Sequence, residues 1–173
     1  MEEYFDIYDA QGNHTGTAPR RLCHGNPALI HRTAHVVVID PETGNILLQK
    51  RNMTKDIQPG KWDTAVGGHL ALGEDFETGA KRELAEELGI DDAELFHIFD
   101  SKIRNDIESE DVRVFGAFIA DGFTFDPGEI DEIRFWNRAE LENPANRENF
   151  TPNLITELEL LKQTGKFYPP EQL

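Results

Sequence analysis

The sequence predicts an α+β domain in which a mixed β-sheet carries at least two helices. Three observations predict this: short β-prone runs punctuated by turn residues, one amphipathic helical stretch in mid-chain, and a second near the end. The 173 residues suit a single domain over 1–173, and a chain of this length buries about 70% of its unfolded surface. Hydrophobic residues make up 38% of the chain, which excludes a wholly disordered protein.

The expected strands begin near the N-terminus. Residues 4–8 are β-prone and fold back through a turn onto residues 14–17, so we expect an N-terminal β-hairpin within residues 1–25. Residues 33–39 form an apolar run typical of a strand buried on both faces, and turn residues lead from it into a return strand at 46–49. The remaining strands are expected at 95–99, 112–120 and 133–136, with a loop over 52–61.

Two helices are expected. The first covers about 76–88, where apolar residues recur every four positions and form one stripe. Gly89 fits its C-terminal cap. The second begins at Thr151, which is a favourable N-cap, with Pro152 at the first helical position.

The charge of the chain limits its partners. There are 33 Asp and Glu against 17 Lys and Arg, a net charge of −16, which repels nucleic-acid polymers and anionic membranes. No apolar run approaches the roughly 18–20 residues of a membrane helix, and the first residues lack a signal-peptide pattern. The single Cys23 excludes an internal disulfide and a cysteine-based zinc site. We therefore expect a soluble cytoplasmic protein with a small-molecule substrate.

The middle helix concentrates acidic residues on one face. Glu83, Glu86 and Glu87 fall within an arc of about 100°. Like charges three or four residues apart destabilise a helix by roughly 0.2–0.5 kcal/mol per pair. Arg82 can pair with Glu86 or Glu74, but one guanidinium cannot neutralise all of these acids. A hard divalent cation such as Mg²⁺ can, because it takes oxygen ligands and keeps waters that a phosphate can replace.

The spacing within residues 68–90 decides between a metal site and an ordinary solvated helix face. Gly67 and Gly68 let the backbone approach a ligand closely. From Gly68 the pattern reads Gly-x5-Glu-x7-Arg-Glu-aliphatic-x-Glu-Glu-x-Gly-aliphatic, nine specified positions over 23 residues. It matches every fixed position of the Nudix box. The sequence therefore resembles the Nudix hydrolase superfamily.

The resemblance implies a fold and a reaction. Nudix proteins are α/β/α sandwiches in which the box forms a loop–helix–loop, and they hydrolyse a nucleoside diphosphate linked to another group. They use Mg²⁺ or Mn²⁺ as cofactor. In a site this acidic, a metal ion would bridge the diphosphate to the protein, polarise the phosphoryl oxygen and lower the pKa of bound water.

The resemblance also implies roles for single residues. Arg82 and Glu74 would orient the metal ligands, a role whose loss costs roughly 10–100-fold in metal affinity or activity. The implied ligands are Glu83, Glu87 and the Gly68 carbonyl, with Glu86 as a further ligand or as the base that acts on the attacking water.

Residues outside the box narrow the resemblance. The segments 31–38, 47–51, 59–63 and 67–69 are similar to the Nudix branch closest to isopentenyl-diphosphate isomerase. That isomerase uses a cysteine in an Asn-x-x-Cys-Ser-His-Pro segment shortly after a Trp. Here the residues after Trp62 read Asp-Thr-Ala-Val-Gly-Gly-His. Isomerase activity is therefore the rival enzymatic interpretation rather than the expected one. A non-catalytic, nucleotide-sensing Nudix domain is a second rival, against which the intact glutamates argue.

Some further residues are weaker candidates for the site. Many Nudix enzymes place an additional catalytic acid on a late loop, which favours Glu129 or Glu132, although a plain charged turn is the competing interpretation. Lys50 or Arg51 could pair with a substrate phosphate at a strand end. His69 could approach the substrate or cap the loop.

Two histidines and the hairpin complete the expectations. His31 and His35 are four residues apart, which on a strand separates them by about 13 Å, too far for one metal ion. We expect both to be partly buried strand residues. The N-terminal hairpin could act as the arm of a homodimer, since hairpins can be exchanged between protomers.

Overall fold

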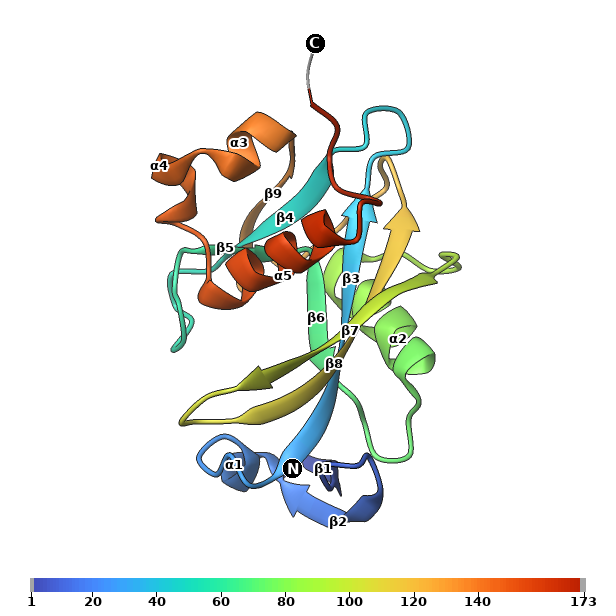
Figure 1. Cartoon of the computed structure of the whole chain (residues 1–173), viewed down its shortest axis with the longest axis vertical. Coiled ribbons are helices and arrows are strands. Elements are labelled where there is room, and N and C mark those ends of the chain that lie inside the picture. Colours follow the sequence, from blue (N-terminus) through green and yellow to red (C-terminus); the bar gives the residue numbers. More distant parts are fainter. Residues whose placement is uncertain (1, 172–173) are drawn as a thin grey trace.

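A nine-stranded mixed sheet lies between helices in the computed structural model, which describes residues 2–171 (Figure 1). The strands are β1 (Tyr4–Tyr8), β2 (His14–Pro19), β3 (Ile30–Ile39), β4 (Ile46–Arg51), β5 (Trp62–Thr64), β6 (Val66–His69), β7 (Phe96–Arg104), β8 (Ser109–Phe118) and β9 (Ile130–Trp136). The helices are α1 (Arg20–Cys23), α2 (Phe76–Leu88), α3 (Arg138–Glu142), α4 (Pro144–Arg147) and α5 (Pro152–Gln163). The expected α+β class with a mixed sheet and an N-terminal hairpin is confirmed.

Strand β3 organises the sheet. It pairs in parallel with β8 over its whole length, from Ile30↔Ser109 to Ile39↔Phe118, and antiparallel with β6. Strand β4 meets β3 only at Ile39↔Ile46 and then pairs with β5 and β9, so β3 and β4 diverge. The consecutive strands β5 and β6 carry the chain from β4 across to β3.

The two faces of the sheet hold separate hydrophobic cores. Ala34, Val36 and Val38 of β3 point to one face and pack with the apolar stripe of α2. Val37 and Ile39 point to the other face and pack with α5. Figure 1 shows α2 and α5 on opposite sides of β3. This alternation produces an α/β/α sandwich and accounts for the continuous apolar run in β3.

Local capping sets the ends of the two long helices. The Asp75 carboxylate accepts a hydrogen bond from the Thr78 N–H at the start of α2, and Gly89 ends the helix in the left-handed conformation with φ +67°. At α5 the Thr151 hydroxyl accepts from the Leu154 N–H. Helix α2 therefore begins and ends where the sequence predicted, and α5 begins where it predicted.

Three strands begin three residues earlier than expected: β3 at Ile30, β8 at Ser109 and β9 at Ile130. Each early segment carries charged or polar residues that interrupt the apolar pattern. His31 and Glu110 are nevertheless buried, because they lie directly opposite each other in the β3–β8 register. The sequence also failed to predict β5, β6, α1, α3 and α4, which are too short to show a period.

The hairpin lies at the end of the sheet where β3 begins (Figure 1). Strand β1 joins β3 only at Tyr8↔Ile30. Phe5 of β1 packs in a small separate core with Ile7, Ala18 and Cys23. Among residues 2–171, no helix is both long and apolar enough to span a membrane.

Candidate functional site

Three of the four glutamates of α2, which we call the α2 glutamates (Glu83, Glu86 and Glu87), lie beside strand β6. The Glu83 side chain is 14% exposed, and a side chain at Gly68 would overlap its carboxyl group. The Gly67 N–H donates to Glu87 Oε2 at 3.3 Å. Glu86 is 60% exposed and faces solvent. The structure therefore gathers these glutamates and the two glycines in one place.

Arg82 ties this group together. Its Nε and Nη2 donate to the two oxygens of Glu74, at 2.9 and 3.0 Å. Its Nη1 donates to Glu83 at 2.8 Å and to Glu86 at 3.2 Å. Nη2 also donates to the His69 carbonyl at 3.0 Å. Arg82 thus orients two of the α2 glutamates and fixes them to the end of β6, and Glu74 holds Arg82 in turn.

The electrostatics of this group favour a cation. Burial, reinforced by the neighbouring Glu83 charge, raises the pKa of Glu87 to about 8. Burial also raises the pKa of Glu83, whereas hydrogen bonds from Arg82 lower the pKa of Glu74. One guanidinium therefore does not compensate all the carboxylates. An all-oxygen donor set of this kind suits Mg²⁺ or Mn²⁺.

A second group of metal-binding side chains lies on the opposite face of β6, at its His69 end. Its members, which we call the His/Glu cluster, each offer one atom, and these atoms all lie within 4.8 Å of one another. They are His24 after α1, His31 on β3, His69 at the end of β6, Glu108 before β8 and Glu110 on β8.

The polar atoms of the His/Glu cluster face one another. His69 Nε2 lies 3.1 Å from Glu110 Oε1 and 3.2 Å from His24 Nε2. His24 Nε2 lies 3.3 Å from Glu108 Oε2. His31 is fully buried, and its Nε2 lies 3.4 Å from Glu110 Oε1 without the alignment of a hydrogen bond. A buried ring nitrogen left unpaired is costly, so the cluster has the features of a ligand set.

The protonation state of the cluster fits a metal ion. Burial and the neighbouring His69 lower the pKa of His24 to about 4, so its ring is neutral at pH 7 and has a lone pair to donate. Burial alone would raise the pKa of Glu110, but the neighbouring His31 and His69 rings outweigh it and lower that pKa, so Glu110 is ionised. Three imidazoles with two carboxylates suit a divalent transition metal better than Mg²⁺.

His69 connects the two groups. Its side chain belongs to the His/Glu cluster, whereas its carbonyl accepts from Arg82 and its neighbour Gly68 packs against Glu83. Side chains alternate along a strand, so Gly68 and His69 face opposite sides of the sheet. Phe5 of the hairpin stacks on His31 and His69 at 5.2 and 4.6 Å between ring centroids. Of the two roles left open for His69, capping a loop does not fit, because His69 ends strand β6.

His35 lies on the same face of β3 as His31 but has different partners. Its Nδ1 lies 2.6 Å from Glu157 Oε2 of α5. Burial alone would lower the pKa of His35, but the Glu157 carboxylate outweighs it and raises that pKa to about 9. The two histidines therefore do not share one ion, as expected. The view of His31 as an ordinary strand residue overlooked the partners that β6, β8 and α1 bring to it.

The remaining candidates have partners other than the α2 glutamates. Lys50 of β4 is opposite Trp62 and Glu132. Arg51 donates from Nε to the Ile57 carbonyl and lies 3.6 Å from Asp63. Glu129 is 62% exposed and pairs with Lys55. In the described part of the chain, no hydrogen bond or ion pair joins any of them to the α2 glutamates.

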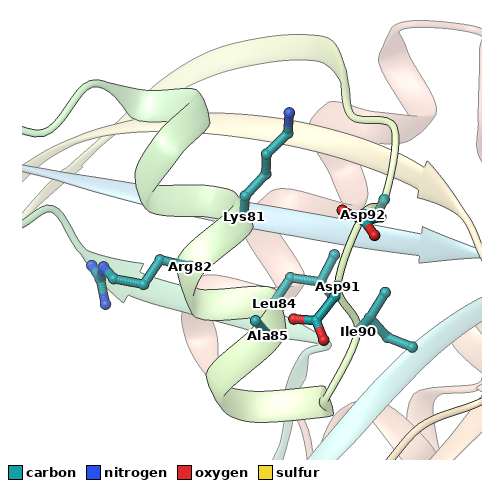
Figure 2. A pocket seen from close by; sticks show the side chains of 8 residues that line it. Lys81, Arg82, Leu84, Ala85, Ile90, Asp91 and Asp92 are labelled. Carbon is teal, nitrogen blue, oxygen red and sulfur yellow. The ribbon is translucent and has the colours of Figure 1, made fainter.

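A cavity of about 320 Å³ lies on the flank of α2 (Figure 2). Asp91 and Asp92 line it, and the Arg82 guanidinium points away from them. None of the α2 glutamates lines this cavity. Arg82, which contacts Glu83 and Glu86, also lines the cavity, so the cavity adjoins the α2 glutamates without including them. The other lining residues are Lys81, Leu84, Ala85, Ile90 and Ala93.

Comparison with known proteins identifies the family. The model of the NUDIX domain matches residues 29–158, more than half of the chain, including the complete box on β6 and α2. The chain belongs to the Nudix family. The resemblance inferred from residues 68–90 is thereby confirmed.

The relatives of this Nudix domain carry two kinds of name. A protein of Yersinia pestis named as an uncharacterised Nudix hydrolase is 36% identical over 162 residues, covering 91% of this chain and 85% of its own. An isopentenyl-diphosphate Delta-isomerase of Streptomyces griseus is 29% identical over a match that covers 89% of this chain and 81% of the isomerase. The crystal structure of DR0079 from Deinococcus radiodurans has a TM-score of 0.72 at 19% identity. The match covers 96% of this chain and 99% of DR0079. This last similarity is one of fold.

Proposed function

We propose that this Nudix domain is a divalent-metal-dependent hydrolase of a diphosphate bond. Its substrate would be a nucleoside di- or triphosphate, or a nucleoside diphosphate linked to another group. The observation that carries this proposal is the complete box, whose three α2 glutamates are gathered against Gly67 and Gly68 and oriented by Arg82.

Each residue of the site has its own proposed role in the reaction. Glu83, Glu87 and the Gly68 carbonyl would hold Mg²⁺ or Mn²⁺, which when bound polarises a phosphoryl oxygen and lowers the pKa of water. Glu86, the most exposed of the α2 glutamates, would take a proton from the attacking water. Water oxygen bonds to one phosphorus, and the bridging P–O bond breaks towards the other phosphate. Arg82 keeps Glu83 and Glu86 in position throughout.

Four residues keep a proposed role on weaker support. Lys50 or Arg51 would offset phosphate charge, and Glu129 would act as an additional acid if the loop before β9 moves towards the substrate. His69 would contribute through the His/Glu cluster, whose imidazole-rich donor set suits Mn²⁺, Fe²⁺ or Zn²⁺.

A substrate screen tests the reaction. The intact protein is incubated with nucleotides and nucleoside diphosphate conjugates in the presence of Mg²⁺ or Mn²⁺, and released phosphate, pyrophosphate and nucleoside monophosphate are measured. We expect turnover of at least one member, abolished by a chelator and restored by the metal. Turnover that is insensitive to chelation would contradict the proposal, and tight nucleotide binding without turnover would favour the sensing interpretation.

Isomerase activity is the second candidate, favoured by relatives named as isomerases. Against it, the position two residues before His69 is Gly67, where the isomerase segment has its cysteine. We expect no allylic isomer when the protein is incubated with isopentenyl diphosphate and either metal. Its appearance at a useful rate would reverse the assignment.

Metal binding is expected to stabilise the fold. Mn²⁺ at about 100 times its dissociation constant should raise the free energy of unfolding by about 2.7 kcal/mol. For a domain of this size that corresponds to about 5–11 °C in melting temperature. Thermal unfolding followed by circular dichroism, with and without chelator, measures the shift. An unchanged melting temperature at saturating Mn²⁺ would exclude both groups as metal sites.

A homodimer formed through the hairpin, and a location in the cytoplasm, also remain proposals. The hairpin already packs on its own chain, because Phe5 stacks on His31 and His69. In a homodimer formed by exchange of this hairpin, Phe5 would make the same stacking contacts with the other subunit.

A further inference from the structure

We propose that His35, held by Glu157, is a positioning residue that sets the place of Glu87 by fixing the backbone at Gly67 and Gly68. The inference rests on the proposed function, because its consequence is metal binding by the α2 glutamates. Three contacts lead from α5, on one side of the sheet, to α2 on the other.

The first contact fastens α5 to the centre of the sheet. His35 Nδ1 and Glu157 Oε2 are 2.6 Å apart, and both side chains are almost fully enclosed. Burying such a pair costs desolvation, and apolar residues of similar volume often stabilise a core equally well. Stability alone therefore does not explain why this pair lies between two apolar layers.

The second contact presses the imidazole onto strand β6. His35 lies directly opposite Gly67 in the β3–β6 register. A Cβ atom at Gly67 would lie 3.0 Å from His35 Cδ2 and 3.2 Å from Nε2, so the ring rests against the glycine backbone. On the other face, Glu83 occupies the space beside Gly68. The two glycines are thus enclosed from both sides, which leaves the strand little room to shift.

The third contact reaches the metal ligand. The Gly67 N–H donates to Glu87 Oε2, and among residues 2–171 this is the only hydrogen bond of the Glu87 carboxylate. Any displacement of the Gly67 backbone therefore moves the one donor that orients Glu87. Metal sites require their ligands to be held within about 0.5 Å of the productive geometry. His35 thus acts on Glu87 through Gly67 without touching the metal.

The test measures Mg²⁺ affinity by isothermal titration calorimetry, which needs no substrate and reports on the oxygen-rich site. His35→Ala is expected to weaken Mg²⁺ binding by about 10–100-fold, the range for residues that orient metal ligands. Glu157→Gln keeps the volume and should act in the same direction if His35→Ala fails to fold. His97→Ala is the matched control, because His97 is an exposed histidine that also pairs with a carboxylate, Asp100.

A paired substitution separates positioning from general destabilisation. Gly67→Ala should weaken Mg²⁺ binding because its methyl group meets the His35 ring. In the double variant with His35→Ala, that methyl fills part of the vacated space, so affinity should recover towards the unaltered protein. Two losses that simply add would overturn the inference.

The outcomes distinguish this inference from the proposed function. If the unaltered protein binds Mg²⁺ and a folded His35→Ala variant binds it equally well, the inference alone fails. If the unaltered protein binds neither Mg²⁺ nor Mn²⁺ by calorimetry, the proposed function fails, and the inference fails with it.

Discussion

Replacing Glu87 by Gln is expected to lower the metal-dependent hydrolysis rate by more than about 100-fold. Loss of a residue that only orients a ligand costs about 10–100-fold, so loss of a proposed ligand should exceed that range. Gln keeps the size of Glu87 and its contact with the Gly67 N–H but lacks the negative charge. Glu83→Gln should have a comparable effect, because Glu83 is the other mostly buried carboxylate of the group.

The control lies on the same helix. Glu77 is 58% exposed and its ion pair is with Lys81, so Glu77→Gln should leave the rate unchanged. The measurements are kcat, KM and Mg²⁺ affinity for each variant on the best substrate of the screen, with circular dichroism to verify folding. Full turnover by both Glu83→Gln and Glu87→Gln would remove the α2 glutamates from the mechanism.

Replacing Glu110 by Ala is expected to abolish transition-metal binding by the His/Glu cluster and to destabilise the fold. Glu110 accepts from the Thr33 hydroxyl at 3.2 Å and lies 3.1 Å from His69 Nε2. Each buried donor left without an acceptor costs about 1–3 kcal/mol. The melting temperature should therefore fall, and its rise on adding Mn²⁺ should become much smaller.

Strand β8 supplies the matched control for this change. Asp111 follows Glu110 on the opposite face and pairs with Arg104, so Asp111→Asn should alter neither Mn²⁺ binding nor the melting temperature appreciably. Electron paramagnetic resonance of Mn²⁺ counts the bound ions in each variant. If Glu110→Ala binds as many Mn²⁺ ions as the unaltered protein with equal affinity, the cluster is a hydrogen-bonded core and not a metal centre.

The α2 site could be predicted because its information is local. Nine specified positions lie within residues 68–90, and the helix that carries them has its own stripe, N-cap and C-cap. Helical geometry then places the glutamates on one face without knowledge of the rest of the fold. The interaction of Arg82 with Glu74 and Glu86 followed from the same spacing and is confirmed.

The His/Glu cluster could not be predicted because its information is spread over the chain. His31 meets Glu110 only through the parallel β3–β8 register, and a parallel pairing of distant strands leaves no trace in a local pattern. Glu108 and Glu110 are two residues apart, which on a strand indicates a shared face, but nothing nearby links them to histidines. The strand spacing correctly indicated that His31 and His35 do not share a metal ion. It gave no information about which residues on other strands lie beside each of them.

Strand β6 contributes to both candidate centres through adjacent residues. Gly68 faces α2 and His69 faces the His/Glu cluster, so one strand register serves both sides of the sheet. A slip of one residue would exchange every inward and outward position in the strand. Depending on its direction, the slip would bring the His69 imidazole against Glu83 or place a glycine in the cluster. The four residues Val66–His69 therefore tolerate substitution at single positions more readily than any insertion or deletion, because a change in length would dismantle both centres together.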